Sequence, residues 1–189
     1  MSVFPEGSMS GEYLPTFNFH ENSVDPHNVV IVNAFGFREN SDGTKIPGPM
    51  NEALAAFTDE HFSDRPILVS PDIAPALQTE PRRVLELNST SGSLDTLKDP
   101  KNTGTAGELL QARAFMREEN YTTAIIIAHA FHVARVARMA QKLDIVTAIP
   151  DGLPKEFDPE SAQEWTRSRE EWVKRERLTI GYMILRRMM

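Results

Sequence analysis

The stretch TTAIIIAHAFHVAR, residues 122–135, decides the fold of this 189-residue chain. Its first seven residues, 122–128, are β-branched or aliphatic, which predicts a short strand buried on both faces of a sheet. A helix is predicted to follow directly, from about residue 131 to 143, with Val133, Val136 and Ala140 on its inward face. A strand that leads straight into a helix is the repeating unit of a parallel α/β sheet.

The same alternation recurs along the rest of the chain. Further strands are predicted over four ranges: 29–32, 66–70, 83–87 and 144–149. Further helices are predicted over three ranges: 49–60, 105–119 and 161–187. Polar loops are predicted before each of these helices, at 38–48, 88–105 and 150–159. Thr105 and Glu108 have the T-x-x-E spacing of a capping box. We therefore expect an α/β fold, a three-layer Rossmann-like, mostly parallel sheet with helices on both faces, over residues 28–189 after an irregular arm at 1–27.

Composition excludes several classes of function. The chain has no cysteine, which rules out disulfides, thiolate zinc or iron–sulfur sites and a cysteine nucleophile. Twenty-seven acidic against twenty basic residues give a net charge of −7, which argues against nucleic acid as a partner. No apolar run approaches the ~20 residues of a transmembrane helix, and the start lacks a signal peptide, so we expect a soluble, cytoplasmic protein. The sequence makes no prediction of oligomeric state.

Charge is unevenly distributed along the chain. Residues 161–189 contain seven basic and four acidic residues, so they carry +3 while residues 1–160 carry −10. This pattern fits either a basic helix that contacts an anionic surface or a solvated helix face on an acidic body. The sequence leaves both interpretations open.

Ligands of open α/β sheets bind outside the carboxyl ends of the strands, which here selects residues near 33–38, 70–72, 88–105 and 128–135. In the last of these, His132 and Arg135 are three residues apart and share one face at a helix N-terminus. Such a corner suits a phosphate or carboxylate, because free amides and the helix dipole favour negative charge. The alternative is that His132 caps the helix and Arg135 pairs with a surface acid.

Other site chemistries have weaker sequence support. His129 and His132 lack the i, i+4 spacing of a zinc helix and no third ligand is fixed, so no metal site is predicted. Ser70 ends a predicted strand, but Pro71 and Asp72 follow it, which is no G-x-S-x-G elbow. A G-x-G-x-x-G fingerprint is absent, which argues against NAD or FAD. His132 is the predicted general acid or base, since the unperturbed pKa of histidine lies near neutrality.

Three segments resemble the SanA/YdcF/ElyC-like family, a group of small Rossmann-like domains. Residues 129–135, His-Ala-Phe-His-Val-Ala-Arg, are similar to the family motif S-x-F-H-M-x-R-A. Residues 102–104 resemble the first half of N-T-x-E-N, although Thr105 and Ala106 stand where Glu and Asn are expected. Residues 175–178, Arg-Glu-Arg-Leu, are similar to the family's R-E-x-L-G helix. The resemblance extends in order over residues 28–187.

The resemblance implies a ligand pocket above the sheet. The expected ligand-binding residues are Asn33, Ala34, Phe35, Gly36, Ser70, Asn102, Thr103, His132, Arg135 and Glu176. The departures from the family pattern replace glycines of the first strand's turn and remove a candidate acid–base carboxylate before the helix. His129, where the family has a small hydroxyl residue, adds a titratable group that is a candidate to replace that carboxylate.

Two functions are compatible with these observations. The first is a small-molecule binding protein or enzyme whose anionic or nucleotide-like ligand, S-adenosylmethionine among the candidates, is held by the Phe-His-x-x-Arg corner. As an enzyme it would be a transferase or hydrolase of a phosphate-containing or nucleotide-like substrate. The alternative is a non-catalytic interaction module related to cell-envelope maintenance, in which residues 1–27 and the basic terminal helix dock a partner or a membrane. Family members often carry an N-terminal membrane anchor, which we do not expect in this chain.

Overall fold

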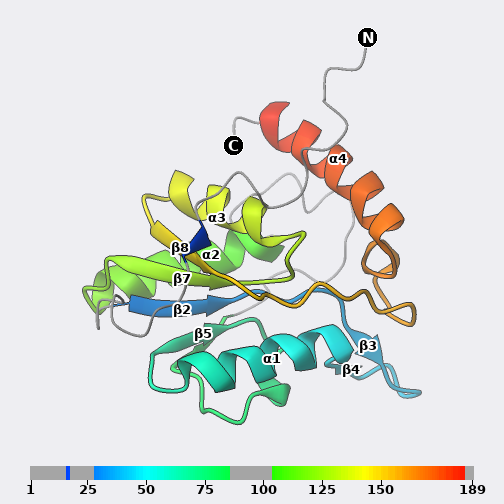
Figure 1. Ribbon diagram of the computed structural model, residues 1–189, viewed down its shortest axis with the longest axis horizontal. Helices are drawn as coiled ribbons and strands as arrows, with labels where there is room; N and C mark the ends of the chain where they lie inside the picture. The colour runs from blue at the N-terminus through cyan, green and yellow to red at the C-terminus, as the bar shows by residue number, and fades with distance from the viewer. Residues whose placement is uncertain (1–15, 18–27, 86–103, 186–189) are drawn as a thin grey trace.

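A computed structural model describes residues 16–17, 28–85 and 104–185, with side chains described to residue 181 (Figure 1). Six strands form one sheet in the order β1-β8-β7-β2-β5-β6, and each pair of neighbours is parallel. The strands are β1 (Thr16–Phe17), β2 (Asn28–Val32), β5 (Ile67–Val69), β6 (Arg83–Val84), β7 (Thr123–Ile127) and β8 (Val146–Pro150). The predicted parallel sheet is confirmed.

The central strands β2 and β7 are buried on both faces. Val30 and Val32 pack into the core on one side of the sheet, and Val29 and Ile31 pack into the core on the other. This division follows from the two-residue period of a strand, which sends alternate side chains to opposite faces. Two apolar layers explain why these strands read as unbroken aliphatic runs.

Helices cover both faces, as predicted. Figure 1 shows α1 (Pro49–Phe62) on one side of the sheet and α2 (Gly104–Glu118) with α3 (Val133–Lys142) on the other. Proline suits the first turn of α1 because its missing N–H has no partner there in any helix. The last helix, α4 (Arg169–Leu185), lies to one side of these layers. The three-layer α/β architecture is therefore confirmed.

Two segments that were expected to be irregular contain strands. Residues 38–48, expected to be a loop, contain an antiparallel hairpin of β3 (Arg38–Glu39) and β4 (Lys45–Ile46). Two-residue strands are too short to show an alternating pattern, so the sequence carried no signal for them. Residues 16–17, within the segment expected to be an irregular arm, pair with β8 as strand β1. The rest of 1–27, like 86–103 of the predicted 88–105 loop, lies outside the described residues.

The predicted helix over 161–187 begins eight residues late. A short 3₁₀ turn, η4 (Glu164–Thr166), precedes α4, so Trp165 lies outside α4 although it falls within the predicted range. The Ser168 hydroxyl accepts a hydrogen bond from the backbone N–H of Glu171 at 3.2 Å, as the side chain of an N-cap residue does. A favoured cap residue thus outweighs the helical pattern of the preceding segment.

The strand order identifies where a ligand would bind. From β2 the chain continues through α1 to β5 and β6 on one side, whereas β7 and β8 lie on the other side of β2. β2 and β7 are therefore the neighbours at which the connections change direction. Ligands of open α/β sheets bind beyond the carboxyl ends of the two strands at such a switch point.

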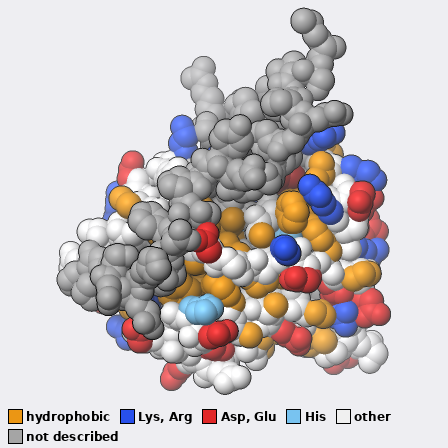
Figure 2. Space-filling model, in the orientation of Figure 1, with side chains coloured by type: hydrophobic (Ala, Val, Ile, Leu, Met, Phe, Trp, Pro, Cys, Tyr) orange, Lys and Arg blue, Asp and Glu red, His pale blue; other side chains and the backbone are white. Residues whose placement is uncertain are grey.

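Charged side chains on α4 form contacts with neighbouring side chains of the same protein. Acidic and basic side chains are interspersed on the side of the molecule where α4 lies (Figure 2). Lys174 pairs with Glu171 at 2.6 Å, and the guanidinium of Arg175 lies 4.9 Å from the centre of the Trp165 ring. Basic side chains on the described part of α4 are thus engaged with neighbours within the protein. Within the described ranges, no helix has the length and apolarity needed to cross a membrane.

Candidate functional site

The turn after β2 is held by side chains from neighbouring elements. The Ala34 N–H donates to the Ser70 hydroxyl at 3.1 Å, and the Phe35 N–H donates to Asn51 Oδ1 at 2.9 Å. The Asn51 amide nitrogen donates in turn to the Gly36 carbonyl at 2.7 Å. Gly36 has φ +78°, a left-handed conformation that glycine adopts without strain. Glycine is therefore the residue that suits this backbone position.

A buried carboxyl group, Glu108, lies beside this turn. Its Oε2 accepts a hydrogen bond from the Asn33 amide nitrogen at 2.6 Å, and its Oε1 accepts one from the Ser70 hydroxyl at 2.5 Å. The end of β2, the end of β5 and the N-terminal part of α2 therefore meet at one carboxyl group that is only 4% exposed.

The predicted capping box at the start of α2 is wrong. The helix already begins at Gly104, so Thr105 lies inside it, and the Glu108 carboxyl bonds to Asn33 and Ser70 instead of the helix terminus. Glu108 shares the buried face of α2 with Ala112. An acidic residue on an apolar helical stripe is the sequence signal that would have identified it, because carboxylates are seldom buried without a specific partner.

Burial raises the pKa of the Glu108 carboxyl, and the negative charge of Asp72 adds to this effect. The hydrogen bonds from Ser70 and Asn33 act in the opposite direction, since they stabilise the ionised form. Burial outweighs them. A carboxyl with a raised pKa can both hold and release a proton nearer to neutral pH, which is the property of a general acid or base.

His132, the residue before α3, is a neutral hydrogen-bond donor. Arg135 Nη2 lies 2.9 Å from His132 Nδ1, and a guanidinium can only donate, so Nδ1 accepts and the proton resides on Nε2. Nε2 lies 3.4 Å from the hydroxyl of Thr105, one helical turn before Glu108 in α2. Burial, with the nearby charge of Arg135, holds the pKa of His132 well below its usual value.

This environment corrects the reason for assigning acid–base catalysis to His132. That prediction relied on a pKa near neutrality, whereas the buried imidazole is neutral and its basic nitrogen is occupied by Arg135. Glu108 is the better acid–base candidate. His132 instead offers a fixed N–H to an acceptor.

Arg135 lies behind His132 and is paired within the protein. Its Nε donates to both carboxylate oxygens of Glu176, at 2.9 and 3.0 Å, and both side chains are largely buried. Burial raises the pKa of Glu176, and the charge of Arg135 opposes that shift. The indole of Trp172 covers the pair, 5.4 Å from the His132 ring and 5.8 Å from the guanidinium. The positive charge expected to hold an anion is therefore compensated by Glu176.

His129 belongs to an aromatic cluster at the end of β7. Its ring stacks on Phe35 with 3.7 Å between centroids and 7° between planes. Nδ1 accepts the Phe131 N–H at 3.2 Å, so Nε2 carries the proton and donates to the Glu156 carbonyl at 3.1 Å. Burial lowers the pKa of His129 to about 4. Both ring nitrogens are therefore engaged within the protein, which leaves His129 no free nitrogen for acid–base chemistry.

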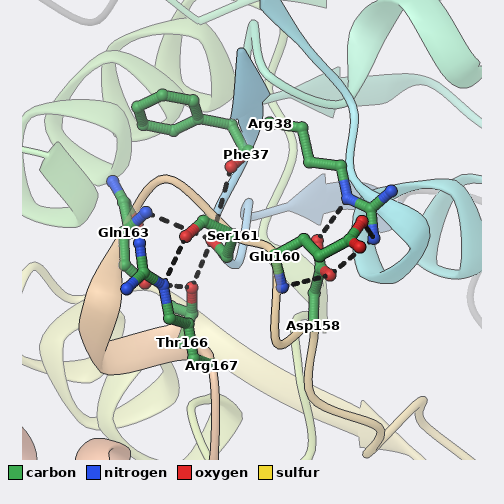
Figure 3. A network of polar contacts seen from close by, with 8 residues as sticks. All are labelled: Phe37, Arg38, Asp158, Glu160, Ser161, Gln163, Thr166 and Arg167. Carbon is green, nitrogen blue, oxygen red and sulfur yellow. Dashed lines mark hydrogen bonds and ion pairs between the residues drawn. The ribbon is translucent and has the colours of Figure 1, made fainter.

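Polar contacts join the segment between β8 and α4 to the residues that follow the turn after β2 (Figure 3). Arg38 donates to both carboxylate oxygens of Asp158, at 2.9 and 2.7 Å, and this hydrogen-bonded guanidinium lowers the pKa of Asp158. The Thr166 hydroxyl donates to Ser161 Oγ at 2.7 Å, and a Cβ on Gly36 would lie only 2.5 Å from Thr166 Oγ1. The chain continues from this packed segment into α4, where Trp172 lies against the His132 ring and Glu176 pairs with Arg135.

The predicted site residues thus fall into three groups. Asn33, Ser70 and His132 lie at the strand ends around Glu108 and Thr105. Ala34, Phe35, Gly36 and His129 shape the turn and the aromatic core, whereas Arg135 and Glu176 support His132. Asn102 and Thr103 lie outside the described residues. The sequence assigned no role in the site to three residues that organise it: Glu108, which was placed in a capping box, Asn51 and Trp172.

Metal binding has no support from side-chain clustering in the segments that the structure describes. Among them, no group of three or more His, Asp or Glu side chains is arranged to hold a metal ion.

Comparison with known proteins found no relative of this chain. No family model matches it, and neither the curated proteins nor the solved structures contain a significant match. The resemblance to the SanA/YdcF/ElyC-like family therefore stays a prediction, and the function must be argued from the contacts at the ends of β2, β5 and β7.

Proposed function

We propose that the protein binds a small nucleotide-like or anionic molecule at the carboxyl ends of β2, β5 and β7, and that it acts on this molecule chemically. One observation carries the proposal: Asn33 at the end of β2 and Ser70 at the end of β5 both donate hydrogen bonds to the buried Glu108 carboxyl of α2, beside the switch point of the sheet. Burying polar groups costs free energy, and sites of binding or catalysis are where proteins commonly retain them.

Two groups in the site have complementary chemical roles. Glu108, whose pKa is raised by burial, is suited to take a proton from a ligand hydroxyl or from water and to return it to a leaving group. His132 is suited to donate its Nε2 hydrogen to an oxygen on which negative charge develops. This division fits a transferase or hydrolase that acts on an oxygen-bearing substrate.

The helix termini favour an anionic part of the ligand. α2 begins at Gly104 and α3 at Val133, and the side chains near both starts contact each other through Thr105 and His132. Helix N-termini carry unpaired amides and partial positive charge, which attract phosphate or carboxylate groups. This contribution requires no free arginine, so it is compatible with the pairing of Arg135 and Glu176.

A thermal-shift screen tests the proposal. The probes are nucleotides, sugar phosphates, S-adenosylmethionine and inorganic phosphate. A ligand at 100 times its Kd stabilises the folded state by about 2.7 kcal/mol, which raises Tm by roughly 5–10 °C in a protein of this size. Glu108→Gln exchanges an acceptor oxygen for an amide nitrogen and cannot take up a proton, so we expect it to reduce the ligand-induced rise by at least half.

The matched control is Glu118→Gln, the same chemical change at an exposed position near the end of α2. This variant should respond to the ligand as the unmodified protein does. The proposal fails if no probe raises Tm, or if Glu108→Gln responds as fully as Glu118→Gln.

A further inference from the structure

The amide of Asn33 has hydrogen-bonding capacity that no described group uses. Its side chain is 1% exposed, and Oδ1 has no hydrogen-bond partner, although Nδ2 of the same amide donates to Glu108. Rotating the amide by 180° would allow Oδ1 to accept a hydrogen bond from a neutral Glu108 carboxyl, but Nδ2 would then lose Glu108 as its acceptor. In the observed orientation one buried polar atom is therefore unpaired, which costs about 1–3 kcal/mol.

A hydroxyl group resolves this problem in both orientations. Hydroxyls donate one hydrogen bond and accept others, so a hydroxyl beside the amide can donate to Oδ1 or accept from Nδ2. The Glu108 oxygens also have free lone pairs, since each accepts one described hydrogen bond. An ionised phosphate oxygen can only accept hydrogen bonds. In the observed orientation it would face Oδ1, which also only accepts, so Oδ1 would remain unpaired.

Charge at this position also disfavours phosphate. The nearby guanidinium of Arg135 is compensated by Glu176, at 2.9 Å, and His132 accepts a hydrogen bond from Arg135 as a neutral ring. Asn33 itself is hydrogen-bonded to an ionisable group, the carboxyl of Glu108. An anion placed against the Asn33–Glu108 pair would therefore face a carboxyl with no unpaired cation among the described neighbours.

We propose that the Asn33–Glu108 pair recognises a sugar hydroxyl of the ligand, as on the ribose of a nucleoside or on a hexose ring. This inference rests on the proposed function, because it assigns a ligand group to the same site. Phosphate, where the ligand carries one, binds elsewhere in the site. The pair then selects for hydroxylated ligands, since an analogue that lacks the hydroxyl leaves the buried amide unpaired.

The decisive experiment changes the ligand and leaves the protein intact. Isothermal titration calorimetry compares adenosine, guanosine, cytidine and uridine with their 2′,3′-dideoxy counterparts, glucose with its monodeoxy derivatives, and inorganic phosphate alone. We expect at least one hydroxylated compound to bind, its deoxy counterpart to bind at least tenfold more weakly, and phosphate alone not to compete with it.

A second experiment locates the discrimination on the protein. Asn33→Leu removes the polar amide at similar volume, so the affinity ratio between a hydroxylated ligand and its deoxy counterpart should fall toward one. Asn28→Leu is the matched control: Asn28 is also buried and its Oδ1 also lacks a partner, but it lies at the opposite end of β2. This variant should retain the full ratio.

The outcomes separate the two proposals. Binding of a hydroxylated compound and its deoxy counterpart with equal affinity overturns the hydroxyl inference and leaves the proposed function standing. Tight binding of phosphate in competition with the sugar has the same consequence. Failure of every compound in both screens overturns the proposed function and the inference with it. Should Asn33→Leu not fold, the comparison of ligands on the unmodified protein still decides.

Discussion

His129 is expected to make the stability of the fold depend steeply on pH. In the folded protein its ring is fully buried, stacks on Phe35, and uses Nδ1 as the acceptor of the Phe131 N–H. Protonating Nδ1 would break that bond and place a charge in the aromatic cluster. The unfolded chain has no such constraint. Acid therefore stabilises the unfolded chain relative to the folded protein.

The magnitude follows from the two pKa values. Burial lowers the pKa of His129 from 6.5 to about 4 in the folded protein. Between these values the unfolded chain binds more protons, so the free energy of unfolding falls as the pH is lowered. The loss begins near pH 6.5 and amounts to about 3 kcal/mol at pH 4, since each pKa unit corresponds to ~1.4 kcal/mol.

Urea unfolding at several pH values between 7.5 and 4 measures this dependence, with His129→Phe as the reference variant. Phenylalanine retains the stacking on Phe35 but does not titrate, and its loss of the hydrogen bonds to Phe131 and Glu156 is the same at every pH. We expect the free energy of unfolding of the unmodified protein, minus that of His129→Phe, to fall by about 3 kcal/mol from pH 7 to pH 4. Taking the difference cancels the titration of carboxyl groups common to both proteins, whose pKa values are raised at Glu108 and Glu176 and lowered at Asp158.

Direct titration of the ring gives an independent measurement. NMR of the imidazole nitrogens should show His129 as the Nε2–H tautomer at pH 7, with a protonation midpoint near 4. A midpoint near 6.5, or a stability difference that changes by less than about 1 kcal/mol over this pH range, would refute the reasoning, because each pKa unit contributes ~1.4 kcal/mol.

Three further changes test the packing around the site by urea or thermal unfolding. Gly36→Ala should destabilise the fold by at least about 2 kcal/mol, because it forces φ +78° on a residue with a Cβ and places that atom 2.5 Å from Thr166 Oγ1; wild-type stability would refute the close approach. Trp172→Ala should cost about 3–5 kcal/mol and Trp172→Phe clearly less; equal losses would exclude cavity formation as the cause. Asp158→Asn should lower Tm at pH 7, and the deficit should shrink as the pH falls below 4, because the hydrogen-bonded Arg38 lowers the pKa of Asp158 and stabilises its ionised form; a deficit independent of pH would contradict this coupling.

The architecture was predictable because its signals are local. Aliphatic runs at 29–32, 66–70 and 122–128 mark strands buried on both faces, and the helical segments between them require parallel pairing. The hairpin at 38–46 was missed because two-residue strands have no period to detect. The late start of α4 depends on Ser168, whose hydroxyl caps the helix at a point that the apolar pattern alone does not mark.

The site was predictable only in part, because several of its contacts join residues that are far apart in the sequence. Asn33, Ser70 and His132 were identified since each follows or adjoins a strand end, where the fold collects ligand contacts. Glu108 was given a local role by the T-x-x-E pattern. Its actual partners lie 75 and 38 residues away in the chain, and no local spacing encodes contacts of that kind.

The Phe-His-x-x-Arg segment shows how a nonlocal partner changes the chemistry that a motif suggests. Spacing alone correctly predicts that His132 and Arg135 share a face, and their 2.9 Å contact follows from it. It does not predict that Glu176, 41 residues further on, compensates the arginine. With Glu176 in place, Arg135 acts on His132 as a hydrogen-bond donor that fixes the tautomer, rather than as a free cation for a ligand. The hydrogen-bonding groups left for a ligand are then the Asn33 amide and the Glu108 carboxyl, with the His132 N–H directed at the Thr105 hydroxyl. This set is better suited to the hydroxyl groups of a sugar than to a bare phosphate.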